Sequence, residues 1–154
     1  MNNIIEITLE QVKGIKTKAQ IEYERNQAIA DLLNDNYFEP LDNSLKGPWR
    51  LDISVEKNHI CLKLIASDEI AQIWQLPQAA FRSIVKDYFI ITDSYAEAIN
   101  SGNTQRIEAI DMGRRGIHNE GAQILMEHLE QDVQTDLDTA RRLFTLICIL
   151  HIRG

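Results

Sequence analysis

Four arginines and one histidine are the residues of this sequence best suited to bind a charged ligand. Arg114 and Arg115 are adjacent, His118 follows three residues later, and Arg141 and Arg142 form a second adjacent pair near the end of the chain. Guanidinium groups donate paired hydrogen bonds that match the oxygens of phosphate and carboxylate groups. If the fold brings the two pairs together, the sequence predicts a site for an anionic ligand.

The first arginine pair belongs to residues 113–121, which contain three glycines among polar side chains. We expect a connection between two helices here, in which Asn119 caps the second helix and free backbone N–H groups help to bind an oxyanion. His118 or Glu120 is the candidate for proton transfer. These residues complete the predicted ligand-binding set, which is Arg114, Arg115, His118, Asn119, Glu120, Arg141 and Arg142.

A structural interpretation of each arginine pair stays open. Gly113 would end the first helix, and Asp111 would pair with Arg115 four residues further on. In the second pair, the arginines oppose the dipole of the last helix, because they lie in its first turn. An ion pair from Asp138, the expected cap, to Arg142 would compensate this placement.

Residues 113–121 partly match three known sequence motifs. The spacing of Gly116 and Gly121 is that of a phosphate-binding Walker A loop, but the required Lys and Ser/Thr are missing, which excludes it. His118 and Glu120 have the spacing of the zinc deaminase motif without its cysteines, so no metal or other cofactor is predicted. Residues 113–116 read GRRG, a short match to the RNA-clamping loop of KH domains.

The elements that must position these residues begin with strands in the first half of the chain. Residues 4–9 read as a strand and residues 19–33 as an amphipathic helix. Alternating apolar residues from Trp49 to Val55 and from Ile60 to Leu64 predict a hairpin. We expect this hairpin, together with residues 37–41 and 70–76, to form an antiparallel meander.

The second half of the chain has helical periodicity. A helix of about six turns begins with Pro77 at its first position and stops at Gly102, and shorter helices cover residues 104–112 and 119–131. The last helix, after Asp138, is apolar nearly all round and should be buried. The prediction is therefore one α+β domain over residues 1–154: an antiparallel meander sheet of three to five strands against four to five helices, with a buried C-terminal helix.

Composition narrows the class of protein. The formal net charge of −7 disfavours a protein that coats nucleic acid or an anionic membrane. No apolar run approaches the ~20 residues of a membrane span, and the first residues do not resemble a secretory signal. Two isolated cysteines predict neither a disulfide framework nor a thiolate metal site. We expect a cytoplasmic protein.

Three blocks of sequence resemble a known family. They cover residues 81–89, 107–121 and 138–148, and the segment Tyr37-Phe38-Glu39-Pro40 adds to them. These blocks resemble a bacterial group catalogued as uncharacterised protein family 0262. The resemblance spans essentially the whole chain and implies a cytosolic protein of bacteria, in particular of alphaproteobacteria, without an activity, cofactor or catalytic residue.

Three functional hypotheses follow. The leading one is a non-enzymatic binding or regulatory protein with an unknown protein partner or a small anionic ligand, since no pair of nucleophile and base has a recognisable spacing. The second is a small enzyme or sensor that binds a phosphorylated metabolite or nucleotide through the arginines. The third is RNA binding through the GRRG segment. A homo-oligomer is compatible with all three.

Overall fold

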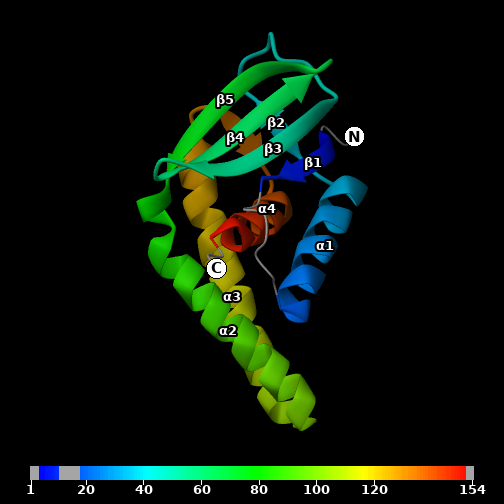
Figure 1. Cartoon of the computed structure of the whole chain (residues 1–154), viewed down its shortest axis with the longest axis vertical. Coiled ribbons are helices and arrows are strands. Elements are labelled where there is room, and N and C mark those ends of the chain that lie inside the picture. Colours follow the sequence, from blue (N-terminus) through cyan, green and yellow to red (C-terminus); the bar gives the residue numbers. More distant parts are fainter. Residues whose placement is uncertain (1–3, 11–17, 152–154) are drawn as a thin grey trace.

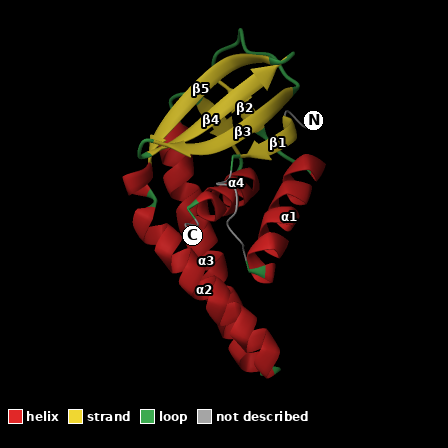
Figure 2. Ribbon diagram, in the orientation of Figure 1, coloured by secondary structure: helices red, strands yellow, loops and turns green. Residues whose placement is uncertain are grey.

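The computed structural model describes residues 4–10 and 18–151, and it confirms the predicted α+β class (Figures 1 and 2). A sheet lies at one end of the molecule, helices pack beneath it, and two long helices extend away from it (Figure 1). The elements are, in order, β1 (Ile4–Leu9), α1 (Ala19–Asn34), β2 (Phe38–Pro40), β3 (Trp49–Glu56), β4 (His59–Ala66), β5 (Glu69–Pro77), a 3-10 turn (Gln78–Ala80), α2 (Arg82–Ser101), α3 (Thr104–Leu129), β6 (Val133–Thr135) and α4 (Leu137–Leu150).

The main sheet has the strand order β1-β3-β4-β5. Strands β3, β4 and β5 form the predicted antiparallel meander, with Leu51 opposite Leu64 and Leu62 opposite Trp74 on the buried face. Strand β1, in contrast, pairs with β3 in parallel, which the prediction of a purely antiparallel sheet missed. The reason is the connection: α1 lies between β1 and β3 in sequence, and such a crossover is what parallel neighbours require.

The expectation that residues 37–41 join the meander is wrong. Strand β2 pairs instead with β6 in a separate antiparallel sheet of two strands, where Phe38 lies opposite Thr135 and Pro40 opposite Val133. Strand β6 has only three residues, too few to show a period of two in the sequence. The small sheet ties the segment after α1 to the segment before α4, more than ninety residues later.

Helix α2 begins at Arg82, not at Pro77, because Pro77 is still the last residue of β5 and the 3-10 turn intervenes. It ends at Gly102 as predicted, where φ is 71° in the left-handed region that favours glycine. Helix α3 then runs back along α2, with Asn103 as its cap; the Asn103 side chain accepts a hydrogen bond from the Arg106 amide at 3.1 Å. The two helices form the long hairpin of Figure 1.

The prediction of two helices separated by a connection at residues 113–121 is wrong, because α3 is continuous from Thr104 to Leu129. Gly113 is therefore no helix end, Asn119 no cap, and the GRRG segment no loop. A glycine inside a helix costs only about 1 kcal/mol relative to alanine, so packing can override it. Gly121 has such a packing role, since a Cβ atom there would overlap the ring of Phe144 on α4.

Helix α4 is the buried C-terminal helix that its apolar sequence predicts. Residues 143–149 are all buried, and α4 lies below the sheet between α1 and the α2–α3 hairpin (Figure 2). Its cap differs from the prediction: Asp136, not Asp138, accepts the Thr139 amide at 2.8 Å. No helix among the described residues is long and apolar enough to cross a membrane.

Candidate functional site

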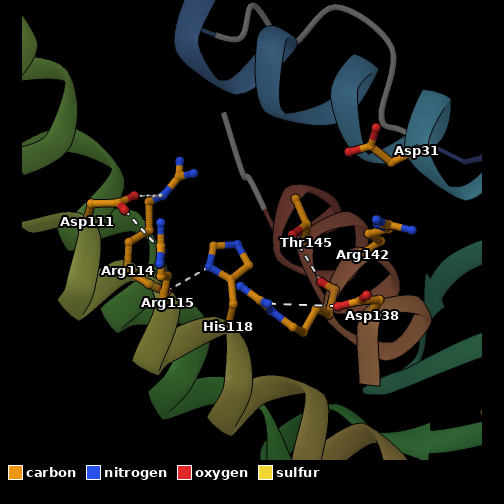
Figure 3. Close-up of a pocket in the computed structure, with 9 residues that line it drawn as sticks. Asp31, Asp111, Arg114, Arg115, His118, Asp138, Arg142 and Thr145 are labelled. Atoms are coloured by element: carbon orange, nitrogen blue, oxygen red, sulfur yellow. Dashed lines mark hydrogen bonds and ion pairs between the residues drawn. The ribbon is translucent and has the colours of Figure 1, made fainter. Parts of the chain in front are cut away.

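A polar pocket of about 290 Å³ opens where α1, α3 and α4 meet. Figure 3 shows Asp111, Arg114 and Arg115 on the α3 side, Asp138, Arg142 and Thr145 on the α4 side, Asp31 on α1, and His118 between the two walls. The continuous helix α3 explains the arrangement, because residues spaced three and four apart project from one face. The lining consists of Asp31, Asp111, Arg114, Arg115, His118, Asp138, Arg141, Arg142 and Thr145.

Five residues of the predicted ligand-binding set are thus brought together: Arg114, Arg115, His118, Arg141 and Arg142 line this one pocket. The other two, Asn119 and Glu120, are exposed on α3 and do not belong to the lining. Consecutive positions on a helix point about 100° apart, which is why Asn119 and Glu120, the next two residues after His118, face elsewhere.

Arg114 is held in place by its neighbours. One guanidinium nitrogen, Nη1, donates to Glu24 Oε1 of α1 at 2.8 Å, and Glu24 is only 9% exposed. The guanidinium carbon lies 4.7 Å from the ring centre of Tyr95 on α2, a cation–π contact. Arg114 therefore joins α1, α2 and α3, and most of its charge is already compensated.

Arg115 is the most accessible arginine of the α3 wall. Its side chain is 70% exposed, and its Nε lies 3.1 Å from Asp111 Oδ2, which confirms the predicted i,i+4 ion pair. Asp111 also lies 3.8 Å from Arg114 Nε, so one carboxylate serves two guanidinium groups. Exposed pairs of this kind contribute little to stability, and a ligand can replace them at small cost.

The other two arginines lie on the α4 wall and have different partners. Arg141 Nη1 lies 3.9 Å from Asp138 Oδ1, at the limit of an ion pair. The predicted pair of Asp138 with Arg142 is therefore wrong, because Asp138 lies beside Arg141 instead. Arg142 Nη1 instead donates to the carbonyl of Asp35, just beyond the end of α1, at 3.3 Å. Positive charge is favourable at a helix C-terminus, so Arg142 has a structural role there.

His118 lies between the two walls with its tautomer fixed by the backbone. Its Nδ1 is 2.8 Å from the carbonyl of Arg114, and a carbonyl can only accept, so Nδ1 carries the hydrogen and Nε2 is the free acceptor of the neutral ring. The ring packs edge-on against Tyr88 and Phe144, at centroid distances of 5.6 and 6.1 Å. Burial lowers the pKa of His118, and with the nearby charges of Arg114 and Arg141 it outweighs the hydrogen bond to the Arg114 carbonyl and the charge of Glu24, which raise the pKa.

The pocket has an excess of positive charge inside an acidic protein. Four arginines and three aspartates line it, which leaves one positive charge when His118 is neutral, whereas the whole chain carries −7.

Two hydroxyl groups complete the surroundings of the pocket. The Thr145 hydroxyl donates to the Arg141 carbonyl at 3.2 Å. Burial raises the pKa of the neighbouring Tyr88 phenol well above its usual value, so this group stays protonated.

Sequence reasoning missed two lining residues, Asp31 and Thr145. Thr145 lies one turn after Arg141 on α4, a spacing that could have suggested it. Asp31 had no such signal, because it lies on another helix and more than eighty residues from His118. Among residues 4–10 and 18–151, no group of three or more His, Cys, Asp or Glu side chains is arranged to hold a metal ion.

Comparison with known proteins gives the family. Residues 1–153 match the Uncharacterised protein family (UPF0262). The chain belongs to this family. It is 46% identical over 153 residues to a UPF0262 protein of Paramagnetospirillum magneticum, covering 98% of this chain and 96% of the relative.

Other UPF0262 relatives are similarly close. A protein of Mesorhizobium japonicum is 45% identical over 152 residues (98% of this chain, 94% of the relative), and one of Caulobacter vibrioides is 53% identical over 133 residues (86% and 82%). The names of these bacterial relatives state no activity, ligand or partner. No solved structure matches the chain.

Proposed function

We propose that this protein is a binding or regulatory protein whose ligand is a small phosphate-bearing anion, held in the pocket between α1, α3 and α4. The observation that carries the proposal is the convergence of four arginines and His118, from segments 23 or more residues apart, around one opening. Of the four, Arg115 has the most exposed ion pair and Arg141 has the longest one. These two arginines are therefore the donors that can turn to a ligand.

His118 extends the same binding chemistry. Because its Nδ1–H is engaged by the Arg114 carbonyl, the neutral ring presents Nε2 as an acceptor for the proton of a phosphate monoanion. Beside a dianion the ring would instead be favoured in its protonated form, in which Nε2 donates. The imidazole can therefore adapt to either charge state of the ligand.

A small enzyme is the second candidate, and the placement of His118 favours it. A neutral histidine inside a pocket that also holds anion-binding arginines could act as a general base. Glu120, the other predicted proton-transfer residue, is exposed outside the lining. An enzyme is distinguished from a binding protein by turnover: release of product from a phosphorylated compound that binds, abolished in His118→Ala.

A thermal-shift screen of phosphate-bearing compounds tests the proposal. A ligand at 100 times its Kd adds about 2.7 kcal/mol of stability, which for a chain of this size raises Tm by roughly 5–10 °C. We expect such a shift in the native protein and its loss in the Arg115→Ala/Arg141→Ala double variant. Arg114 is left intact because its contacts to Glu24 and Tyr95 are structural.

Arg106→Ala is the matched control, since Arg106 lies on α3 away from the pocket and pairs with Glu97 at 3.6 Å. This variant should keep the full shift. The proposal fails if no phosphate-bearing compound raises Tm, or if the double variant responds as strongly as the control.

The cytoplasm is part of the same proposal. A phosphate ester formed by metabolism in the cytoplasm is charged and does not cross a lipid bilayer unaided, so it stays where a cytoplasmic receptor can bind it. Fractionation of the source bacterium should place the protein with the cytoplasmic fraction; recovery from the periplasmic or membrane fraction would contradict this.

A further inference from the structure

We infer, on the basis of the proposed function, that the ligand of this pocket is a small phosphorylated molecule rich in hydroxyl groups, of the sugar phosphate class. The alternatives it replaces are a bare phosphate ion and a nucleotide held through its base. Three properties of the lining distinguish the sugar phosphate from these alternatives: its carboxylates, the free acceptor capacity of Asp31, and its small aromatic surface.

The carboxylates make the pocket less suited to a bare anion than to a ligand that also carries hydroxyl groups. Asp31, Asp111 and Asp138 face the same volume as the four arginines, so a simple ion would be repelled by three negative charges as well as attracted. A ligand with both an anionic group and hydroxyl donors can use both kinds of side chain, because carboxylates accept hydrogen bonds from hydroxyl groups.

Asp31 is the carboxylate with the most free acceptor capacity. Its Oδ1 accepts from Gln27 on the same helix at 3.0 Å, and among the described residues it has no ion pair. Asp111, by contrast, is shared by Arg114 and Arg115, and Asp138 lies beside Arg141. Asp31 thus approaches the pocket from α1, opposite the α3 wall, with lone pairs available for a ligand (Figure 3).

The lining offers little surface for stacking a nucleotide base. His118 is the single ring among the nine described lining residues, and it already makes T-shaped contacts with Tyr88 and Phe144. Proteins that bind bases commonly stack them on aromatic side chains. The volume of about 290 Å³ is also just below the roughly 300–1,000 Å³ of ligand pockets, which suits a compact metabolite.

Isothermal titration calorimetry with matched probes tests the inference. The probes are inorganic phosphate, three hydroxyl-bearing phosphates (glycerol 3-phosphate, ribose 5-phosphate and glucose 6-phosphate), and adenosine 5′-monophosphate, which adds a base to ribose 5-phosphate. We expect at least one of the three to bind ten times more tightly than phosphate, equivalent to about 1.4 kcal/mol. Adenosine monophosphate should bind no more tightly than ribose 5-phosphate.

Asp31→Asn adds a readout that a purely electrostatic site would not give. Removing the negative charge should leave phosphate binding equal or stronger, while the loss of a charged acceptor should weaken the sugar phosphate about tenfold. Asp87→Asn, at an exposed aspartate of α2, is the matched control and should change neither affinity. A Tm within a few degrees of the native value shows that each variant folds.

The outcomes separate this inference from the proposed function. Equal affinity for phosphate and all three hydroxyl-bearing phosphates, or an Asp31→Asn variant that binds both classes as the control does, overturns the inference and leaves the proposed function standing. Adenosine monophosphate binding ten times more tightly than ribose 5-phosphate also overturns it. If no phosphate-bearing probe binds, the proposed function fails as well.

Discussion

Arg114 and Arg115 show how neighbouring residues of one type take different roles. Arg114 is fixed by Glu24 and Tyr95, whereas Arg115 projects into solvent beside Asp111. The sequence could predict that these arginines are special, because guanidinium pairs and the Asp111 spacing are visible in it. It could not predict which arginine is structural, since Glu24 is ninety residues away from Arg114 and the pairing depends on how α1 packs.

Replacing Glu24 tests the structural role of Arg114. Glu24→Gln removes the charge that compensates a partly buried guanidinium, and we expect a loss of about 1–3 kcal/mol in the free energy of unfolding. Urea denaturation measures it. Glu108→Gln, at an exposed site of α3, should stay within about 0.5 kcal/mol of the native protein. Equal stability of the two variants would show that the pair to Arg114 is dispensable.

His118 predicts a pH dependence of stability. Its pKa is lowered in the folded protein, so as pH falls below the unfolded value of about 6.5, the unfolded chain takes up a proton that the folded chain does not. The contribution of His118 to stability is therefore lost as pH falls from about 6.5 toward the folded pKa, by at most about 1.4 kcal/mol per pH unit.

The measurement for His118 is urea unfolding of the native protein and of His118→Gln between pH 7.5 and pH 5. The advantage of the native protein over the variant should shrink on acidification. The exposed residue His59 provides a matched control, His59→Gln, for the loss of one histidine. A native advantage that grows as pH falls would contradict the lowered pKa.

The elements were largely predictable from periodicity, with instructive exceptions. Strands β3 to β5 and helices α1, α2 and α4 follow alternations and turn residues in the sequence. The break expected within α3 rested on three glycines, and the observed helix shows that close packing against α4 is the reason for Gly121. Sequence alone could not reveal this, because the residue that needs the space, Phe144, lies 23 positions further on.

A pair of alanine substitutions tests the continuity of α3. Gly116→Ala should stabilise the protein by about 0.5–1 kcal/mol, because alanine favours helix and a Cβ built there has no other described atom within 4 Å apart from its chain neighbours and the nearby backbone of α3. Gly121→Ala should destabilise it by about 1–3 kcal/mol, since the new methyl overlaps the Phe144 ring. Thermal unfolding of both variants measures the difference.

The opposite ranking would contradict the structure. If residues 113–121 formed the connection that their glycines suggest, Gly116→Ala would be neutral or destabilising, and Gly121→Ala would have no ring to meet. The same pair therefore also tests the relation between α3 and α4 that forms one side of the pocket.

The whole molecule is acidic, but the pocket between α1, α3 and α4 is locally positive. Long-range repulsion should keep polyanions away, whereas a small anion can reach the arginines between the helices. The RNA hypothesis also loses its structural basis, since GRRG lies inside a helix. A protein partner and a homo-oligomer stay predictions, because nothing in the sequence or the pocket determines them.

We expect the protein as a whole to bind RNA only weakly. A single-stranded RNA oligonucleotide should bind with a Kd no tighter than about 10⁻⁴ M at physiological salt, the weak end of non-specific binding. Fluorescence anisotropy measures it. Micromolar binding that the Arg115→Ala/Arg141→Ala variant abolishes would instead mean that the pocket arginines serve a polyanion.

Side-chain NMR tests the central claim, anion binding between the walls of α3 and α4, most directly. Inorganic phosphate is titrated into the ¹⁵N-labelled protein while the Nε–Hε resonances of the arginines are followed. Arg115 and Arg141 should shift together and saturate with one Kd, while Arg106, which lies away from the pocket, should not move. Shifts spread evenly over all arginines, or absent from Arg115 and Arg141, would contradict the account.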